Sequence, residues 1–476
     1  MAILSQPLLF EALGTRQVVA DFSAGILSSD GGVMLLRQID RGLGLVRRLS
    51  QCFVDERKQQ WVDHSLEHLL SQRLYALALG YEDLNDHAQL RRDPLLAAAC
   101  EKLDPTGKDR KMPQFQDAAL AGPSTLNRLE LSNNKDTRCH KIEHVPAKIE
   151  ACLLEMSVRC LPKHTEELVL DLDAMGTLVN GGQEGRFFNS YYDGYCYLPL
   201  YVMCGNLPLW AQLQTADHDA ADGALPAMQK IVAAVRQRFP KARIIIRGDS
   251  GFAREDLMAW CEAQWKVYYC LGLAQNSRLL ETISETMAQA QARHVLCGGV
   301  ATRVFSEFRY QTLKSWTCER RVVAKAEVMA EGKNPRFVVT NLPAEGFEAG
   351  DHRFETQALY EAVYCARGQM ENVLKQQVLD LKSDRLSTHH LESNQLRLWL
   401  SALAYLLLER MRSVGLSGTA LAKATVGTIR LKVLKVAAQV TLSVRRIYIQ
   451  FSAAWPNRQL FATCQAQLQN ADWPSG

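Results

Sequence analysis

The chain has 476 residues, of which 47% are hydrophobic and 22% are charged, a composition typical of a globular protein with a large core. Its length predicts roughly three domains. Thirteen cysteines occur without a signal peptide or a CxxC pair, which argues against a disulfide framework or a zinc finger and indicates reduced thiols in a cytoplasmic protein. The longest apolar run, 398–408, is shorter than the roughly 20 residues of a membrane-spanning helix, so we expect a buried helix and no membrane partner.

The formal net charge of +4 is distributed unevenly along the chain. From residue 410 to residue 473 there are nine basic residues and one acid, Asp472. This segment therefore carries +8, and the rest of the chain carries −4. A basic segment combined with an acidic centre suits a polyanionic substrate such as a nucleic acid. The alternative is a solvated basic surface without such a partner.

The first 165 residues are predicted to form a helical N-terminal domain, because apolar residues recur at helical spacing from 62 to 77. Residues 124–130 have the pattern of a further short helix. His64 and His68 are spaced as in some metal sites, but the HExxH order is absent, and a structural role is favoured.

From residue 167 onward the pattern changes to strands with intervening helices. In chain order the sequence predicts strands at 168–173, 197–205 and 208–215, a helix at 224–239, and strands at 243–248 and 267–272. Three successive strands followed by alternating helix and strand is the order of an RNase H-like core. The expected fold class is therefore α/β with such a core.

Residues 276–350 do not fit within that core and are predicted to be a β-rich insertion. β-branched and aromatic residues alternate there between Gly, Asn and Pro. The expected domains are a helical N-terminal domain at 1–165, a core at 166–275 and 351–400, the insertion at 276–350, and a basic C-terminal region at 401–476.

Two acidic residues lie at the ends of predicted buried strands. Asp173 ends the strand 168–173, and Asp249 follows a strand with three consecutive isoleucines. Two carboxylates at such positions can lie side by side. Asp171 lies two residues earlier on the same strand face and is a rival for the first position. We favour Asp173 because it is nearer the strand end.

A third acid, Glu371, lies on a predicted helix that extends from 358 to 381. Tyr364, Arg367 and Glu371 are three and four residues apart, so they share one stripe of this helix. A surface ion pair between the arginine and the glutamate is the structural alternative.

Carboxylates that converge repel one another unless positive charge lies between them, and their hard oxygens favour Mg²⁺, for which Mn²⁺ could substitute. Two such ions about 3.5 to 4 Å apart would stabilise the attacking and leaving oxygens of a displacement at phosphorus. The residues therefore predict a phosphoryl-transfer enzyme with Asp173, Asp249 and Glu371 as catalytic metal ligands.

The arrangement resembles the DDE-type transposases of bacterial insertion sequences, in the group whose third motif reads Tyr-x2-Arg-x3-Glu, here YCARGQME at 364–371. Blocks at 26–45, 181–202 and 384–398 are similar to those of the insertion-sequence family numbered thirteen-eighty, so the resemblance covers nearly the whole chain. Related families carry a lysine seven residues after the glutamate, where this chain has Val378.

The resemblance implies a DNA transposase that binds the terminal inverted repeats of its element, pairs them as a homodimer and joins them to double-stranded target DNA. It implies that Tyr364 and Arg367 contact DNA phosphate, with Lys375 in place of the missing lysine, and that residues 124–130 help to bind the DNA ends. It also implies a nucleoid-associated protein in a bacterial cytoplasm. The long insertion favours a hairpin intermediate.

Two other classes remain as alternatives. The segment LDLDAMGT is superficially similar to the start of haloacid-dehalogenase-like phosphatases, with Asp171 as nucleophile. That pattern fails at Met175, where a threonine is expected, and at Ala253, where a further acid is expected. A non-catalytic DNA-binding protein would account for the basic segment but not for three spaced carboxylates.

Overall fold

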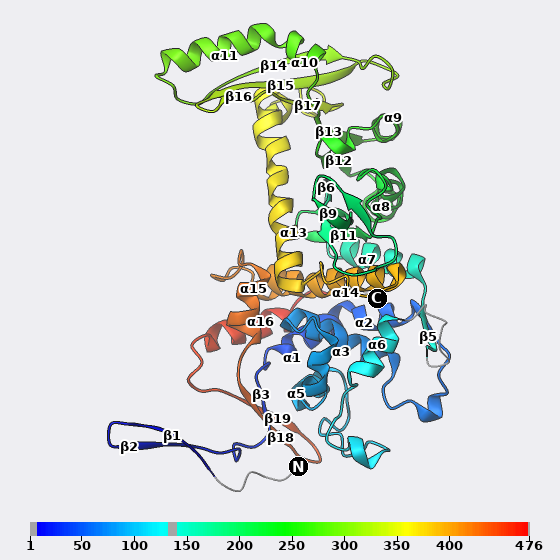
Figure 1. Cartoon of the computed structure of the whole chain (residues 1–476), viewed down its shortest axis with the longest axis vertical. Helices are drawn as coiled ribbons and strands as arrows, with labels where there is room; N and C mark the ends of the chain where they lie inside the picture. Colours follow the sequence, from blue (N-terminus) through cyan, green and yellow to red (C-terminus); the bar gives the residue numbers. More distant parts are fainter. Residues whose placement is uncertain (1–6, 132–139, 475–476) are drawn as a thin grey trace. The chain divides into compact units, whose positions relative to one another are not determined.

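The computed structural model describes residues 7–131 and 140–474 (Figure 1). They form two compact units. The middle unit comprises His144–Leu406, and the terminal unit combines Met1–Glu143 with Leu407–Gly476. Helix α14 (Leu391–Arg410) begins in the middle unit and ends in the terminal unit. None of the helices described is both long and apolar enough to cross a membrane.

The middle unit is built on a nine-stranded sheet whose main path has the order β11-β10-β6-β12-β13-β17-β15-β14, while β16 pairs with β15. Its strands are β6 (Glu167–Ala174), β10 (Leu200–Cys204), β11 (Leu207–Gln212), β12 (Arg243–Gly248), β13 (Val267–Leu273), β14 (Thr302–Tyr310), β15 (Arg320–Met329), β16 (Gly332–Lys333) and β17 (Arg336–Thr340). The remaining elements of the unit are β7 (Thr177–Leu178), β8 (Phe187–Asn189), β9 (Gly194–Tyr197), α7 (Pro146–Arg159), α8 (Ala224–Arg238), α9 (Glu255–Ala263), α10 (Ser277–Thr282), α11 (Ser284–Leu296), α12 (Thr356–Ala358) and α13 (Gly368–Leu381).

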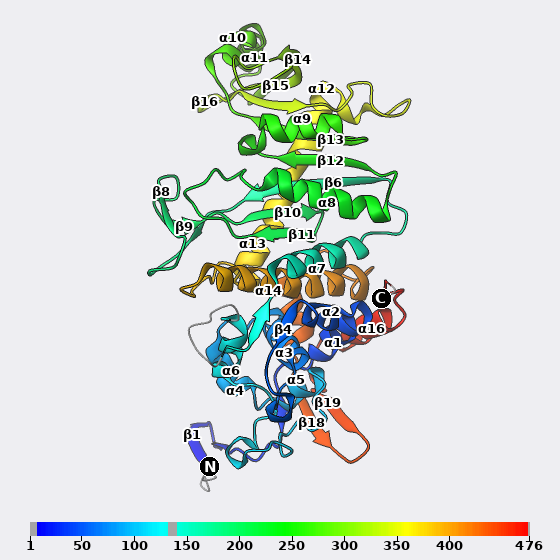
Figure 2. The same ribbon diagram turned by 90° about the vertical axis from the view of Figure 1, so that its right-hand side faces the viewer.

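The strands predicted between 168 and 272 are present, and they form one side of this sheet, from the edge strand β11 to β13. β6, β10 and β11 are antiparallel neighbours, whereas β12 runs parallel to both β6 and β13. Ile244, Ile245 and Ile246 on β12 are all buried, as expected for a strand covered on both faces. Helices α8 and α9 cover one face, and α13 lies on the other (Figures 1 and 2).

The segment 276–350 contains the predicted strands, and these extend the same sheet. It also contains two helices, α10 and α11, which the sequence analysis does not predict. α11 packs on β14 and β15 and buries only Met287 and Ala290, so its apolar stripe is too narrow to stand out in the sequence.

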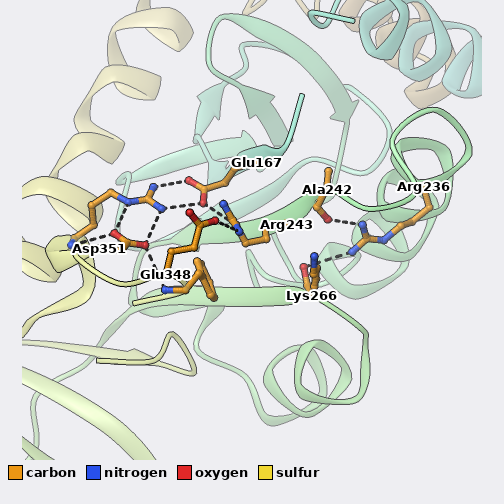
Figure 3. Close-up of polar contacts among 9 residues, drawn as sticks. Glu167, Arg236, Ala242, Arg243, Lys266, Glu348 and Asp351 are labelled. Atoms are coloured by element: carbon orange, nitrogen blue, oxygen red, sulfur yellow. Dashed lines mark hydrogen bonds and ion pairs between the residues drawn. The ribbon is translucent and has the colours of Figure 1, made fainter. Parts of the chain in front are cut away.

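An ion-pair network fixes the segment that leads from the insertion into the helix of the Tyr-Arg-Glu motif (Figure 3). Arg353 binds Glu167 at the start of β6 at 2.7 Å and Asp351 at 2.9 Å. Arg243 at the start of β12 contacts Glu167 and Glu348, each at 3.4 Å. These contacts hold residues 348–353 at the end of the sheet where β6 and β12 begin.

The terminal unit consists of helices and small sheets. Its helices are α1 (Val33–Leu43), α2 (Leu45–Ser50), α3 (Leu66–Leu79), α4 (His87–Leu90), α5 (Pro94–Ala99), α6 (Pro123–Glu130), α15 (Val426–Ile429) and α16 (Arg458–Gln469). Its strands are β1 (Leu8–Leu13), β2 (Arg16–Ala20), β3 (Leu27–Ser28), β4 (Phe53–Asp55), β5 (Ile142–His144), β18 (Ala438–Leu442) and β19 (Ile447–Phe451), of which β1 and β2 form an exposed hairpin that was not predicted.

Several cations of the basic C-terminal segment are structural. Lys435 binds Asp30 at 2.5 Å, Arg430 donates to the carbonyl of Ala78, and Arg412 pairs with Glu409. Part of the positive charge of this segment is therefore bound to groups within the terminal unit itself.

Candidate active site

Asp173 and Asp249 lie at the same edge of the sheet and on the same face. β6 and β12 are parallel neighbours, and their register pairs Asp171 with Arg247. Asp173 follows Asp171 by two residues, and Asp249 follows Arg247 by two residues. Because side chains alternate between the faces of a sheet, both acids point to the same face as the Asp171–Arg247 pair. The predicted proximity of the two strand ends is present in the structure.

Asp171 is already committed to a buried ion pair. Both of its carboxylate oxygens accept from Arg247, at 2.7 and 2.8 Å, and Arg247 also donates to the carbonyl of Val363 at 2.6 Å. Asp171 and Arg247 are 4% and 8% exposed. This pairing explains why Asp171 is the weaker candidate for a metal ligand. The role of Arg247 was not predicted from the sequence.

The helix of the Tyr-Arg-Glu motif reaches the same edge. Arg367 donates to Asp173 at 3.3 Å, although the two residues are 194 positions apart in sequence. Both side chains are mostly buried. This ion pair ties the start of α13 to the end of β6.

The predicted continuous α-helix at 358–381 is helical throughout but not uniformly α. It consists of α12, a π-helical turn at Leu359–Tyr364, a 3₁₀ turn at Cys365–Arg367, and α13. π-Helical turns often occur at functional sites, where they change which side chains face a neighbour. The prediction that Tyr364, Arg367 and Glu371 follow one another on a regular α-helix is therefore wrong, because the turns that carry the first two are π-helical and 3₁₀.

Asp173 lies within electrostatic range of the other two acids. Burial raises the pKa of Asp173 to about 6; Arg367 opposes this rise, while the charges of Asp249 and Glu371 add to it. Negative charge is thus concentrated at this edge beyond what Arg367 neutralises.

Tyr364 lies against the backbone that carries Asp249. A Cβ atom added to Gly272 on β13 would lie 2.6 Å from the Tyr364 hydroxyl and 2.9 Å from the backbone nitrogen of Ser250. Only glycine leaves room for this approach. Gly272 is a second residue of the site that the sequence analysis missed, since nothing in VYYCLG indicates which strand residue a distant tyrosine contacts.

Glu371 and Lys375 are exposed on the first two turns of α13. Lys375 has no ion-pair partner among the residues described. Trp210 is buried, and Tyr192 packs on Gly176, three residues beyond Asp173.

The donor set fits a divalent cation in its chemistry, because it offers hard carboxylate oxygens and an excess of negative charge. However, within residues 7–131 and 140–474 no three His, Cys, Asp or Glu side chains are close enough to hold a metal ion. Asp249 also accepts from the Gly251 amide at 2.8 Å as a helix cap. The carboxylates are therefore neighbours and not a preformed metal cage.

The pattern of two strand-end aspartates and a helix-borne glutamate agrees with a comparison of the whole sequence with protein families. Residues 10–473 match the family described as "Transposase DDE domain group 1". The chain belongs to this family. It is a DNA transposase, an enzyme that binds DNA and cleaves and transfers its strands during recombination, and transposases of this family use divalent metal ions.

A similarity was also found to a solved structure of a piggyBac transposase synaptic complex with hairpin DNA. It covers 86% of this chain and 80% of that chain, with 10% sequence identity and a TM-score of 0.41. A TM-score this low does not establish a shared fold. No curated protein sequence matches the transposase at a significant level.

Proposed function

We propose that this transposase recognises the terminal inverted repeats of a bacterial insertion sequence of the Tyr-x2-Arg-x3-Glu group, similar to the family numbered thirteen-eighty. The ion pair between Arg367 and Asp173 carries the proposal. It brings the motif helix to the edge where β6 and β12 end, which is the arrangement that a three-carboxylate phosphoryl-transfer site requires.

The catalytic core is proposed to be RNase H-like. Support comes from its five adjacent strands β11, β10, β6, β12 and β13, of which the first three are antiparallel and the last three run parallel. The segment between β13 and the motif helix would be the insertion. Residues 1–165 would bind DNA ends and dimerise, and residues 401–476 would add basic surface.

Asp173, Asp249 and Glu371 are proposed to hold two Mg²⁺ ions, which Mn²⁺ could replace. When bound, the ions would supply charge stabilisation for displacement at phosphorus. Arg367 neutralises part of the negative charge at Asp173 and lies where it can donate to a phosphate oxygen. Tyr364, whose hydroxyl lies close to Gly272, and the exposed Lys375 are proposed as further phosphate contacts.

The enzyme is proposed to act as a homodimer in the cytoplasm, bound to the nucleoid. In each protomer a water molecule would attack the phosphodiester at one element end and free a 3′-hydroxyl. This 3′-hydroxyl would then attack the next phosphodiester. The second strand would be opened through a hairpin, since the insertion adds a large segment between the second and third acids.

The test uses purified protein and labelled duplexes made from the DNA that flanks the reading frame. Nicking that needs Mg²⁺ or Mn²⁺ and is lost in Asp249→Asn, while DNA binding remains, would support the proposal. A hairpin product would support the second-strand route, and staggered hydrolysis would contradict it. Equal nicking by Asp249→Asn would exclude the assigned site.

A further inference from the structure

The terminal unit contains a cavity of about 430 Å³ with a strongly basic wall. Three segments that are distant in sequence form it: residues 57–64, residues 110–115, and the region of α6 and the start of β5. Its charged lining residues are Arg57, Lys58, Arg110, Arg128 and Lys141, with Asp63 as the single acid.

Two of these cations are fixed by partners of their own. Arg57 binds both oxygens of Asp55, at 2.8 and 2.7 Å. Arg110 donates to the carbonyl of Ala118 at 2.7 Å and to Asp63 at 3.3 Å. These pairs neutralise the two guanidinium groups and make the wall rigid.

The other three cations are available to a ligand. Lys58, Arg128 and Lys141 are exposed, and the described part of the chain supplies none of them with an acidic partner. The cavity therefore has three uncompensated positive charges at its rim. Such a cluster is maintained against its own repulsion most readily where an anion is bound.

Two buried polar atoms in the same wall also lack a partner. His64 is 5% exposed, and its Nδ1 makes no hydrogen bond to any residue described. The Nε of Arg110 is likewise buried without an acceptor. Unpaired buried polar groups are costly, so these two atoms favour a further hydrogen-bond partner at this wall.

An aromatic side chain completes the site. Trp61 is 74% exposed, although tryptophan side chains are on average largely buried. It lines the cavity together with Phe115, over whose ring the Arg110 guanidinium lies at 5.4 Å. Free cations beside an exposed aromatic ring are the combination that holds the backbone and bases of a nucleic acid.

We propose that this cavity binds a DNA strand, with phosphates on Lys58, Arg128 and Lys141 and a base or sugar against Trp61. The inference rests on the proposed function and adds a DNA contact that does not involve the catalytic carboxylates. It gives the terminal unit a defined recognition surface.

The test is the anisotropy of a labelled duplex from the element's end, titrated with full-length protein at several salt concentrations. Lys58→Gln/Lys141→Gln should weaken binding about tenfold and reduce the slope of log K against log salt by about 2. Trp61→Ala should weaken binding about fivefold to tenfold without changing that slope, and Trp61→Phe should restore most of it. The matched control is Lys241→Gln/Lys314→Gln, which removes two exposed lysines elsewhere and should bind normally.

The readouts separate the two proposals. If the pocket variants bind as tightly as wild type while metal-dependent nicking continues, the pocket proposal is overturned and the catalytic one stands. If wild type neither binds nor nicks the duplex, the proposed function itself fails. Inorganic phosphate and chloride are also compared as competitors at equal ionic strength. If phosphate displaces DNA more strongly than chloride from the wild type but not from Lys58→Gln/Lys141→Gln, the cavity is a free-anion site and the proposal is wrong.

Discussion

Asp171 and Asp173 lie on one face of β6 but have different partners, and this difference can be measured. Asp171→Asn would leave Arg247 buried and unpaired, because a guanidinium cannot give up its proton, and should cost about 3 to 5 kcal/mol of unfolding free energy. Asp173→Asn should instead stabilise the metal-free protein at pH 8 by about 1 to 3 kcal/mol and lower nicking by roughly 10³-fold. Urea unfolding and nicking rates give both values. Reversed effects would make Asp171 the ligand.

The raised pKa of Asp173 predicts the pH dependence of the enzyme. Its folded-state pKa of about 6 lies above the ordinary aspartate value of 3.8, so the native metal-free state binds the proton more tightly than the unfolded state does. The contribution of Asp173 to stability is therefore largest below pH 4, and it falls by about 3 kcal/mol in total as the pH rises through 6. A divalent cation competes with this proton, so the acid limb of the nicking rate should move to lower pH as Mg²⁺ increases. An acid limb that is independent of Mg²⁺ would contradict a metal-ligand role for Asp173.

The three acids were proposed from the sequence because strand ends and helical spacing leave a visible pattern, and their role as metal ligands stays a prediction. Arg247 and Gly272 could not be found in this way, since their roles depend on strand register and on a contact with the distant Tyr364. One signal was present in the sequence, because LDLD and IRGD each place charged residues two positions apart. If the two strands are parallel and in register, Asp171 lies opposite Arg247, with Asp173 and Asp249 beside this pair.

β13 contributes to the site through the absence of a side chain at Gly272. Gly272→Ala should displace Tyr364 or the backbone at 249–250, with about tenfold slower nicking and a stability loss of about 1 to 3 kcal/mol from overpacking. Gly182→Ala is the matched control, because a Cβ there meets no atom within 4 Å. Nicking rates and thermal unfolding of both variants check this. Unchanged nicking by Gly272→Ala would show that the position of Tyr364 is not critical.

The elements of the sheet were predictable to different degrees. β6 and β12 have continuous apolar runs that few structures other than buried strands can accommodate. The helices at 277–296 were missed because they bury few residues, and the β1–β2 hairpin because all of its side chains are exposed. The π and 3₁₀ turns before α13 depend on packing against β12, where Arg247 binds the Val363 carbonyl.

The terminal unit is assembled from both ends of the chain, which no local pattern in the sequence reveals. The Gly31 and Gly32 amides donate to the carbonyls of Val436 and Leu434 at 2.9 and 3.0 Å. A Cβ added at Gly42 would collide with the ring of Trp473. The N-terminal helices therefore complete their core with residues that follow α14.

Removal of residues 411–476 tests this dependence. The truncated chain should lose protection from proteolysis in residues 7–131, because α1 would lose its contacts with α16 and Asp30 would be left without Lys435. Residues 144–406 have their own sheet and core and should remain protected. Lys435→Gln, which removes one ion pair and keeps the segment, should stay protected throughout. Limited proteolysis read by mass spectrometry distinguishes these cases, and intact protection of 7–131 in the truncated chain would show that the N-terminal part folds alone.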